Sequence, residues 1–225
     1  MIRLQQVTKV YSLGEVEVRA LDGVTLTIGP GEFVALVGPS GCGKSTLLNL
    51  MAGIDRPTSG EVWLEGERLD RLSDDGLARL RRSKVGIVYQ FFNLLPTLTA
   101  RENVALPLLL DGLRRGEIEG RVERELQRVG LTHRAEHWPH ELSGGEQQRV
   151  AIARAIVAEP RVVLADEPTG NLDSVAGGVV LDLLEELHRG QSQTIVLATH
   201  SQEAVRRAGR IVHLRDGRIE GLEGP

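Results

Sequence analysis

The chain has 225 residues, of which 41% are hydrophobic and 26% are charged, and its formal net charge is −4. This composition is typical of a soluble globular protein, and the charge gives no electrostatic basis for binding nucleic acid. Because Cys42 is the only cysteine, no internal disulfide can form.

The protein is expected to be cytoplasmic, without direct insertion into a membrane. The first ten residues, MIRLQQVTKV, lack the apolar core of a secretory signal. The longest apolar run, VALPLLL at 104–110, contains Pro107 and is far shorter than the ~20 residues of a membrane span.

Two regions near the N terminus are predicted to form antiparallel strands. Residues 1–32 and 60–70 alternate between apolar and polar side chains, as in IRLQQV and EVWLEGE. The pairs Asp22-Gly23 and Pro30-Gly31 are typical of turns between such strands.

Four short apolar runs separated by helical patterns predict an α/β core with a mainly parallel sheet. The runs are FVALVG (33–38), VGIVYQ (85–90), RVVLAD (161–166) and TIVLATH (194–200). Helices are predicted over 45–53, 118–130 and 179–190, each ending near a glycine. A final hairpin over 210–222 is predicted to turn at Asp216-Gly217.

Residues 91–141 lack a strand pattern and are predicted to form a mainly helical insertion between two strands of the core. Thr99 and Glu102 have the spacing of a capping box, and Pro107 is expected to break or bend the helix that follows. The predicted organisation is one domain over 1–225, with a core at 1–90 and 142–225 that includes the antiparallel β subdomain, and a helical subdomain at 91–141.

The segment GPSGCGKS at 38–45 matches the phosphate-binding motif G-x-x-x-x-G-K-[ST]. A predicted strand enters it and a predicted helix leaves it, which favours this interpretation over a glycine-rich turn with an incidental lysine. Lys44 is predicted to reach the β- and γ-phosphates of a nucleoside triphosphate, and Ser45 to bind Mg²⁺. The predicted nucleotide contacts are Gly38, Pro39, Ser40, Gly41, Cys42, Gly43, Lys44, Ser45 and Thr46.

Polar residues at the ends of the other three apolar runs predict the chemistry of phosphoryl transfer. Asp166 is expected to support Mg²⁺, and Glu167 to polarise a water in line with the γ-phosphate. Gln90 has an amide oxygen for the metal and an amide group for the water, and His200 is predicted to bind the γ-phosphate or orient the carboxylate. A lone Gln or His at a strand end is usually structural, but four such ends in one sheet indicate a site.

The stretch LSGGEQQRVAIARA at 142–155 begins a helix through two glycines. Ser143 and Glu146 have capping-box spacing, which explains those two residues without explaining Gly144 and Gly145. Glycines leave the backbone amides of a helix mouth open to an anion, so residues 143–145 are predicted to be a second phosphate site. Since 38–46 already accounts for one triphosphate, this second site is expected to hold the γ-phosphate bound by another copy of the chain.

This stretch resembles the signature of ATP-binding cassette (ABC) ATPases, and with GPSGCGKST, Gln90, VVLADE and His200 the resemblance spans essentially the whole chain. The resemblance implies a P-loop NTPase fold and a head-to-tail dimer that encloses two ATP molecules. It also implies that Tyr11 stacks on adenine, with packing within a strand as the alternative, and that Asp173 lies where the two subunits meet. Ser201 follows His200 where the family often has Asp.

The segment after Gln90, FFNLLPTLTARENVALPL, is unusually apolar. It either packs the helical insertion against the core or forms a groove for a partner over 91–107. The segment and GNLD at 170–173 resemble the lipoprotein-releasing and macrolide-exporting subgroup, whose partners are integral membrane permeases. The expected function is the ATP-hydrolysing subunit of a transporter, peripheral on the inner face of the cell membrane. The alternative is an ABC ATPase that regulates a membrane protein mechanically, without moving cargo, as in cell division or cell-wall hydrolysis.

Overall fold

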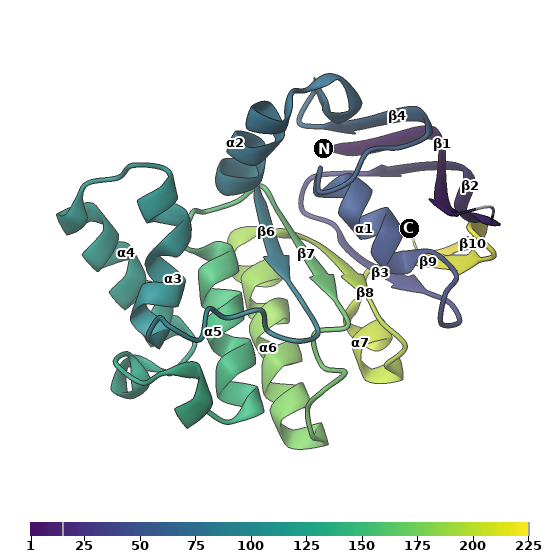
Figure 1. The fold of residues 1–225 in the computed structure, drawn as a ribbon. Helices are drawn as coiled ribbons and strands as arrows, with labels where there is room; N and C mark the ends of the chain where they lie inside the picture. Colours follow the sequence, from purple (N-terminus) through teal and green to yellow (C-terminus); the bar gives the residue numbers. More distant parts are fainter. Residues whose placement is uncertain (15, 225) are drawn as a thin grey trace. The chain divides into compact units, whose positions relative to one another are not determined.

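The computed structural model of the chain describes residues 1–14 and 16–224. It divides into two compact units, one formed by Met1–Ala78 with His188–Pro225 and the other by Arg79–Leu187. These bounds differ from the predicted subdivision at residues 91–141, which stays a prediction. The elements of each unit are labelled in Figure 1.

The first unit contains the antiparallel sheet predicted from the alternating N-terminal pattern. Its strands lie in the order β2-β1-β4-β5. Ile2 and Leu4 on β1 pair with Leu64 and Val62 on β4, and all four side chains are fully buried. The alternation therefore places one face of this sheet in the core, as predicted. The strands are β1 (Ile2–Leu13), β2 (Val16–Ile28), β4 (Ser59–Leu64) and β5 (Glu67–Arg68).

The predicted turn at Asp22-Gly23 is wrong, because both residues lie inside β2. The pairing of β1 with β2 shifts register between Val7 and Lys9, opposite these two residues. Gly23 has φ +64° there, and its amide donates to the Thr8 hydroxyl at 3.1 Å. The Asp-Gly pair thus serves a β-bulge, which needs the same positive φ as a turn.

The first unit also carries strands in the order β10-β9-β3-β8, with β3 parallel to both β8 and β9. The β9–β10 hairpin turns at Asp216 and Gly217, whose φ values of +47° and +75° confirm the predicted turn. The strands are β3 (Phe33–Val37), β8 (Thr194–Ala198), β9 (Arg210–Arg215) and β10 (Arg218–Glu223); the short helices are α1 (Lys44–Met51), α7 (Gln202–Arg207) and the 3-10 turn η1 (Leu69–Arg71).

The second unit contains the parallel pair β6 (Val85–Val88) and β7 (Val162–Asp166), which lie side by side in Figure 1. The described residues 91–141 form helices and turns, as predicted. On α4, Ile118, Val122 and Leu126 form the expected buried stripe. The helices are α3 (Ala100–Leu110), α4 (Arg115–Arg128) and α5 (Gly144–Ile156), with 3-10 turns η2 (Thr132–Arg134) and η3 (Pro139–Glu141).

Two helices include residues of both units, and neither was delimited correctly from sequence. Helix α2 (Asp74–Lys84) was not predicted. Helix α6 (Ser174–Gln191) begins earlier than the predicted 179 and passes through Gly190.

Helix α3 confirms one of its two predicted features. Thr99 Oγ1 accepts from the Glu102 amide at 3.2 Å, and Glu102 Oε2 accepts from the Thr99 amide at 2.8 Å, which is the predicted capping box. A break at Pro107 is wrong, because α3 continues to Leu110, and a bend there stays a prediction. Among the described residues, no helix is long and apolar enough to cross a bilayer.

Candidate nucleotide-binding site

The predicted phosphate loop lies between β3 and α1 and requires glycine at its two ends. Gly38 has φ +153°, and a Cβ there would lie 2.1 Å from the Leu214 carbonyl oxygen. Gly43 has φ +108°, and a Cβ there would lie 2.6 Å from the Ala20 carbonyl oxygen. Gly43 also forms the N-cap of α1 and has no side chain to cap it, so the first amides of α1 are open to an anion.

The Lys44 side chain is folded into this loop. It is only 8% exposed, and its Nζ donates to the carbonyl oxygens of Gly38 at 2.8 Å and Pro39 at 3.1 Å. The neighbouring Cys42 is also buried, with Sγ 4.0 Å from Lys44 Nζ. Ser45 is exposed at the first turn of α1. The loop thus concentrates amide donors and one ammonium group where a phosphate would bind.

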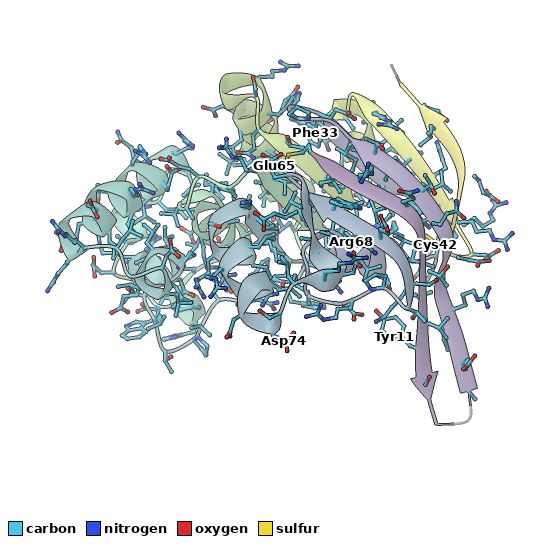
Figure 2. All side chains as sticks on the ribbon, turned by 90° about the horizontal axis from the view of Figure 1, so that it is seen from above. Tyr11, Phe33, Cys42, Glu65, Arg68 and Asp74 are labelled. Carbon is cyan, nitrogen blue, oxygen red and sulfur yellow. The ribbon has the colours of Figure 1, made fainter. Side chains whose placement is uncertain are left out.

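Tyr11 belongs to the same unit and is held by residues that the sequence did not single out. Its hydroxyl donates to Asp55 Oδ2 at 2.9 Å, and the Lys9 ammonium lies 4.8 Å from the ring centroid. Figure 2 labels Tyr11 beside β1, the strand from which it projects. Lys9 and Asp55 are 46 residues apart, so no local pattern indicated this cluster.

His200 follows β8, and the phosphate loop follows β3, which is parallel to β8 in the first unit. His200 and Gly38 both line a cavity of about 510 Å³ in this unit. The structure therefore brings these two predicted strand ends together. Ser201 caps α7, since its hydroxyl accepts from the Ala204 amide at 3.4 Å.

In the second unit, Gln90 and Asp166 lie at the ends of the paired strands β6 and β7. The Gln90 carbonyl oxygen accepts from Asn171 Nδ2 at 3.0 Å, so the Gln90 segment contacts the 170–173 loop. Glu167 has φ +46°, and its carbonyl oxygen accepts from the Gly170 amide at 2.9 Å. A left-handed glutamate is a strained conformation of the kind that concentrates at functional sites.

Gln148, which was not predicted from sequence, joins these two strand ends to helix α5. Its side chain is fully buried, and Nε2 donates to the carbonyl oxygens of Tyr89 at 3.3 Å and Pro168 at 2.7 Å. Tyr89 precedes Gln90, and Pro168 follows Glu167. A signal was available, because Gln148 lies four residues before Ile152 on the buried face of the helix.

The predicted capping box at the mouth of α5 is confirmed. The Ser143 hydroxyl accepts from the Glu146 amide at 3.3 Å, and Glu146 Oε2 accepts from the Ser143 amide at 2.8 Å. Arg134 Nε also donates to Glu146 Oε1, at 3.2 Å. The hydrogen bond from the Ser143 amide is the main reason that the pKa of Glu146 lies below its ordinary value, with Arg134 contributing further.

The two glycines at this mouth differ in how closely they are packed. A Cβ on Gly145 would lie 2.9 Å from Ala176 Cβ, so internal packing alone requires this glycine. Packing is thus a second reason for glycine at position 145, and the predicted contact of both glycines with an anion stays a prediction. A Cβ on Gly144 would lie 3.5 Å from Leu172 Cδ2 and 3.6 Å from Phe92 Cζ, which are ordinary contact distances. Packing within the chain therefore does not require Gly144.

Asp173 has a structural role that the sequence interpretation did not include. Its Oδ1 accepts from the Ala176 amide at 2.8 Å, which caps the start of α6. Asp173 is exposed, and its predicted place between two subunits stays a prediction.

The apolar segment after Gln90 is partly packed and partly exposed. Phe92 is half-buried, whereas Phe91 is 72% exposed and Leu95 is 42% exposed. Nearby, a cavity of about 390 Å³ lies in the second unit, and Tyr89, Asn93, Leu106, Pro107, Leu110 and Arg154 are among its lining residues. Packing thus explains Phe92 but not Phe91.

Arg154 holds the backbone of this segment. Its guanidinium donates to the carbonyl oxygens of Phe92 at 2.8 Å and Asn93 at 2.6 Å. Both residues are left-handed, with φ values of +59° and +49°. Burial lowers the pKa of Arg154, and the hydrogen bonds compensate for the loss of water around its charge.

Comparison with known proteins gives one consistent family. The family model described as "ABC transporter" matches residues 21–170. The chain is 49% identical to the lipoprotein-releasing system ATP-binding protein LolD of Geobacter metallireducens, covering 97% of each chain. It is 50% identical to the macrolide export ATP-binding/permease protein MacB of Hyphomonas neptunium over 97% of its own length, but spans only 34% of that protein.

A solved structure shares the fold over the full length of the chain. It is described as the dimeric structure of a post-hydrolysis state of the ATP-binding cassette MJ0796 bound to ADP and Pi. The TM-score is 0.93 and the identity is 44%, with 100% of this chain and 98% of that chain covered.

Proposed function

The chain belongs to the ABC transporter family as an ATP-binding cassette, and from this premise we propose that it hydrolyses ATP to drive an integral membrane permease. Two copies would close on two ATP molecules, and hydrolysis would reopen them. The relatives support this proposal, since one is the ATP-binding protein of a lipoprotein-releasing system and another is a dimeric cassette with ADP and Pi.

We assign the nucleotide contacts as follows. The loop at 38–46 binds the phosphates, with Lys44 neutralising their charge. Ser45, Asp166 and Gln90 offer a hydroxyl, a carboxylate and an amide oxygen, which are the hard donors that Mg²⁺ prefers alongside phosphate oxygens. Glu167 is the base that orients the attacking water, and His200 binds the γ-phosphate. Bound Mg²⁺ would neutralise charge that develops on the phosphates during transfer.

The dimer proposal depends on the finding that packing within the chain does not require glycine at position 144. The capping box at the N terminus of α5 uses the amides of Ser143 and Glu146 and not those of the two glycines between them. Residue 144 is glycine although its neighbours leave room for a Cβ. A bare helix mouth is suited to an approaching anion. We therefore propose that residues 143–145 contact the γ-phosphate held by the other copy, with Asp173 at the same interface.

The segment 91–107 is proposed to contact the permease. Phe91 and Leu95 are exposed, and the adjacent cavity is lined by Leu106 and Pro107. Binding there would hold the protein at the inner face of the cell membrane without inserting it. Because Gln90 immediately precedes this segment, γ-phosphate contacts at Gln90 can change its shape.

Replacing Glu167 with Gln tests the cycle. The variant should bind Mg-ATP, lose hydrolysis and accumulate as a dimer, because closure no longer leads to reopening. Light scattering after size-exclusion chromatography measures the mass with and without Mg-ATP. Glu119→Gln is the control, since Glu119 is exposed on α4 and forms an ion pair with Arg115 one turn away; it should hydrolyse ATP normally. A Glu167→Gln protein that stays monomeric in saturating Mg-ATP contradicts the proposal.

A further inference from the structure

The Tyr11 ring is held by Lys9, which lies two residues before it, and by Asp55, which lies 44 residues away in sequence. Asp55 uses both carboxylate oxygens: Oδ2 accepts from the Tyr11 hydroxyl at 2.9 Å, and Oδ1 accepts from Lys9 Nζ at 2.6 Å. Lys9 Nζ also donates to the Arg56 carbonyl oxygen at 2.8 Å, and the Arg56 amide donates to Asp55 Oδ1 at 2.7 Å. Asp55 is thus held by a lysine, a tyrosine and a backbone amide.

This cluster is tied to both ends of helix α1. The amides of Ile54 and Asp55 donate to the Asn49 carbonyl oxygen at 2.9 and 3.3 Å, which anchors Asp55 to the C-terminal part of α1. At the other end of α1, the Thr46 side chain lies close enough to the Tyr11 hydroxyl to lower its pKa, although burial and Asp55 raise that pKa more. Since Thr46 belongs to both the phosphate loop and the first turn of α1, the cluster lies between that loop and the C-terminal part of the helix.

The charges in the cluster keep the arrangement in one protonation state. Burial raises the pKa of the Asp55 carboxyl, but hydrogen bonds from Lys9 and Tyr11 outweigh this and hold its pKa below the ordinary value. Burial also raises the pKa of the Tyr11 hydroxyl, and the bond to Asp55 raises it further. At neutral pH, Asp55 is therefore an anion and Tyr11 a hydrogen-bond donor to it.

We propose that Lys9 and Asp55 are positioning residues for the nucleobase, which fix the Tyr11 ring relative to the phosphate loop and leave one ring face for stacking. Lys9 lies over one face with its ammonium 4.8 Å from the ring centroid, so the base stacks on the opposite face. This inference rests on the proposed contact between Tyr11 and adenine, and adds the residues that orient that contact.

The test compares a ligand that has a base with one that lacks it. Calorimetry measures the affinity of the purified chain for Mg-ADP and for magnesium pyrophosphate. Asp55→Asn and Lys9→Met should each weaken ADP about threefold, a part of the ~1–3 kcal/mol that stacking of one base contributes. Pyrophosphate affinity should not change. Asp75→Asn is the control, because Asp75 is exposed in the first turn of α2, and it should bind both ligands normally.

Two further variants separate this proposal from the proposed function. Tyr11→Phe keeps the ring but removes the hydroxyl. The losses of ADP affinity caused by Tyr11→Phe and by Asp55→Asn should therefore be less than additive in the double variant. Tyr11→Ala should weaken ADP about tenfold, which corresponds to loss of stacking itself. If Tyr11→Ala weakens ADP but Asp55→Asn and Lys9→Met do not, only the positioning role is wrong. If Tyr11→Ala leaves ADP affinity unchanged, the stacking platform is wrong as well.

Loss of stability has a different signature. If Asp55→Asn weakens pyrophosphate as much as ADP, the cluster merely supports the phosphate loop and the positioning role is refuted. If Asp55→Asn does not fold, Lys9→Met and Tyr11→Phe carry the same comparison, since each removes one contact and leaves the Asp55 carboxylate in place.

Discussion

Replacing Gly144 with Ala tests the proposed phosphate contact at the N terminus of α5 without disturbing the packing of the fold. The added Cβ meets Leu172 and Phe92 at 3.5 and 3.6 Å, so it fits without displacing either. Alanine favours a helix over glycine by up to about 1 kcal/mol, which corresponds to about 2–4 °C in the melting temperature of a domain this size. Gly144→Ala should therefore melt at the same temperature as the parent chain, or slightly higher.

The same change should impair ATP-dependent association. A Cβ at the open mouth keeps a phosphate from approaching the backbone amides, and loss of one hydrogen bond to a charged group costs about 1.5–3 kcal/mol. The dimer of Glu167→Gln carrying Gly144→Ala should then be at least about tenfold weaker in Mg-ATP. Analytical ultracentrifugation over a concentration series measures this, and calorimetry should show unchanged ATP affinity in the monomer.

Gly145→Ala is the informative contrast. Its Cβ would lie 2.9 Å from Ala176 Cβ, and such overpacking costs about 1–3 kcal/mol. This variant should lose several degrees of thermal stability. The reasoning is refuted if Gly144→Ala dimerises as tightly as the parent, because the bare mouth would then have no phosphate to admit.

Three other predictions follow from the same geometry. Lys44→Ala should weaken Mg-ATP binding at least about tenfold, because the ammonium supplies a charged contact to the phosphates; unchanged affinity in calorimetry contradicts the phosphate-loop assignment. Phe91→Asp should abolish stimulation of ATPase activity by the reconstituted permease while basal activity and melting temperature are retained, because Phe91 is 72% exposed; loss of basal activity would instead favour a packing role. The capping box lowers the pKa of Glu146, so the stability that this carboxylate contributes is present above the ordinary value of 4.5 and is lost as pH falls through the lower folded pKa. In a plot of melting temperature against pH, Glu146→Gln should therefore reduce the fall at acidic pH. An unchanged fall would show that other carboxyl groups cause it.

The features that the sequence predicted well depend on short-range patterns. The phosphate loop needs glycines at fixed spacing because backbone must pass close to backbone, and Gly38 against Leu214 shows that constraint directly. The capping boxes of α3 and α5 need side chains three residues apart. In each case the interaction that fixes the structure connects residues close together in the chain or demands glycine outright.

The features that were missed depend on contacts across long separations. Gln148 reaches carbonyl oxygens 59 and 20 residues away, and Arg154 reaches the Phe92 carbonyl 62 residues away. The Ala176 side chain that requires Gly145 belongs to another helix. The Asp22-Gly23 pair shows a further limit, since a bulge and a turn both call for a positive φ and differ only in what lies opposite.

The hydrogen bonds from Arg154 to the carbonyl oxygens of Phe92 and Asn93 have a consequence for motion. If residues 92 and 93 shift without α5, a guanidinium with little access to water loses both acceptors, and each vacated donor costs about 1–3 kcal/mol. Rotating the helix along with them avoids that penalty. The loop after Gln90 and the helix that begins at Ser143 should therefore move together, so that a displacement of the loop is transmitted to the helix.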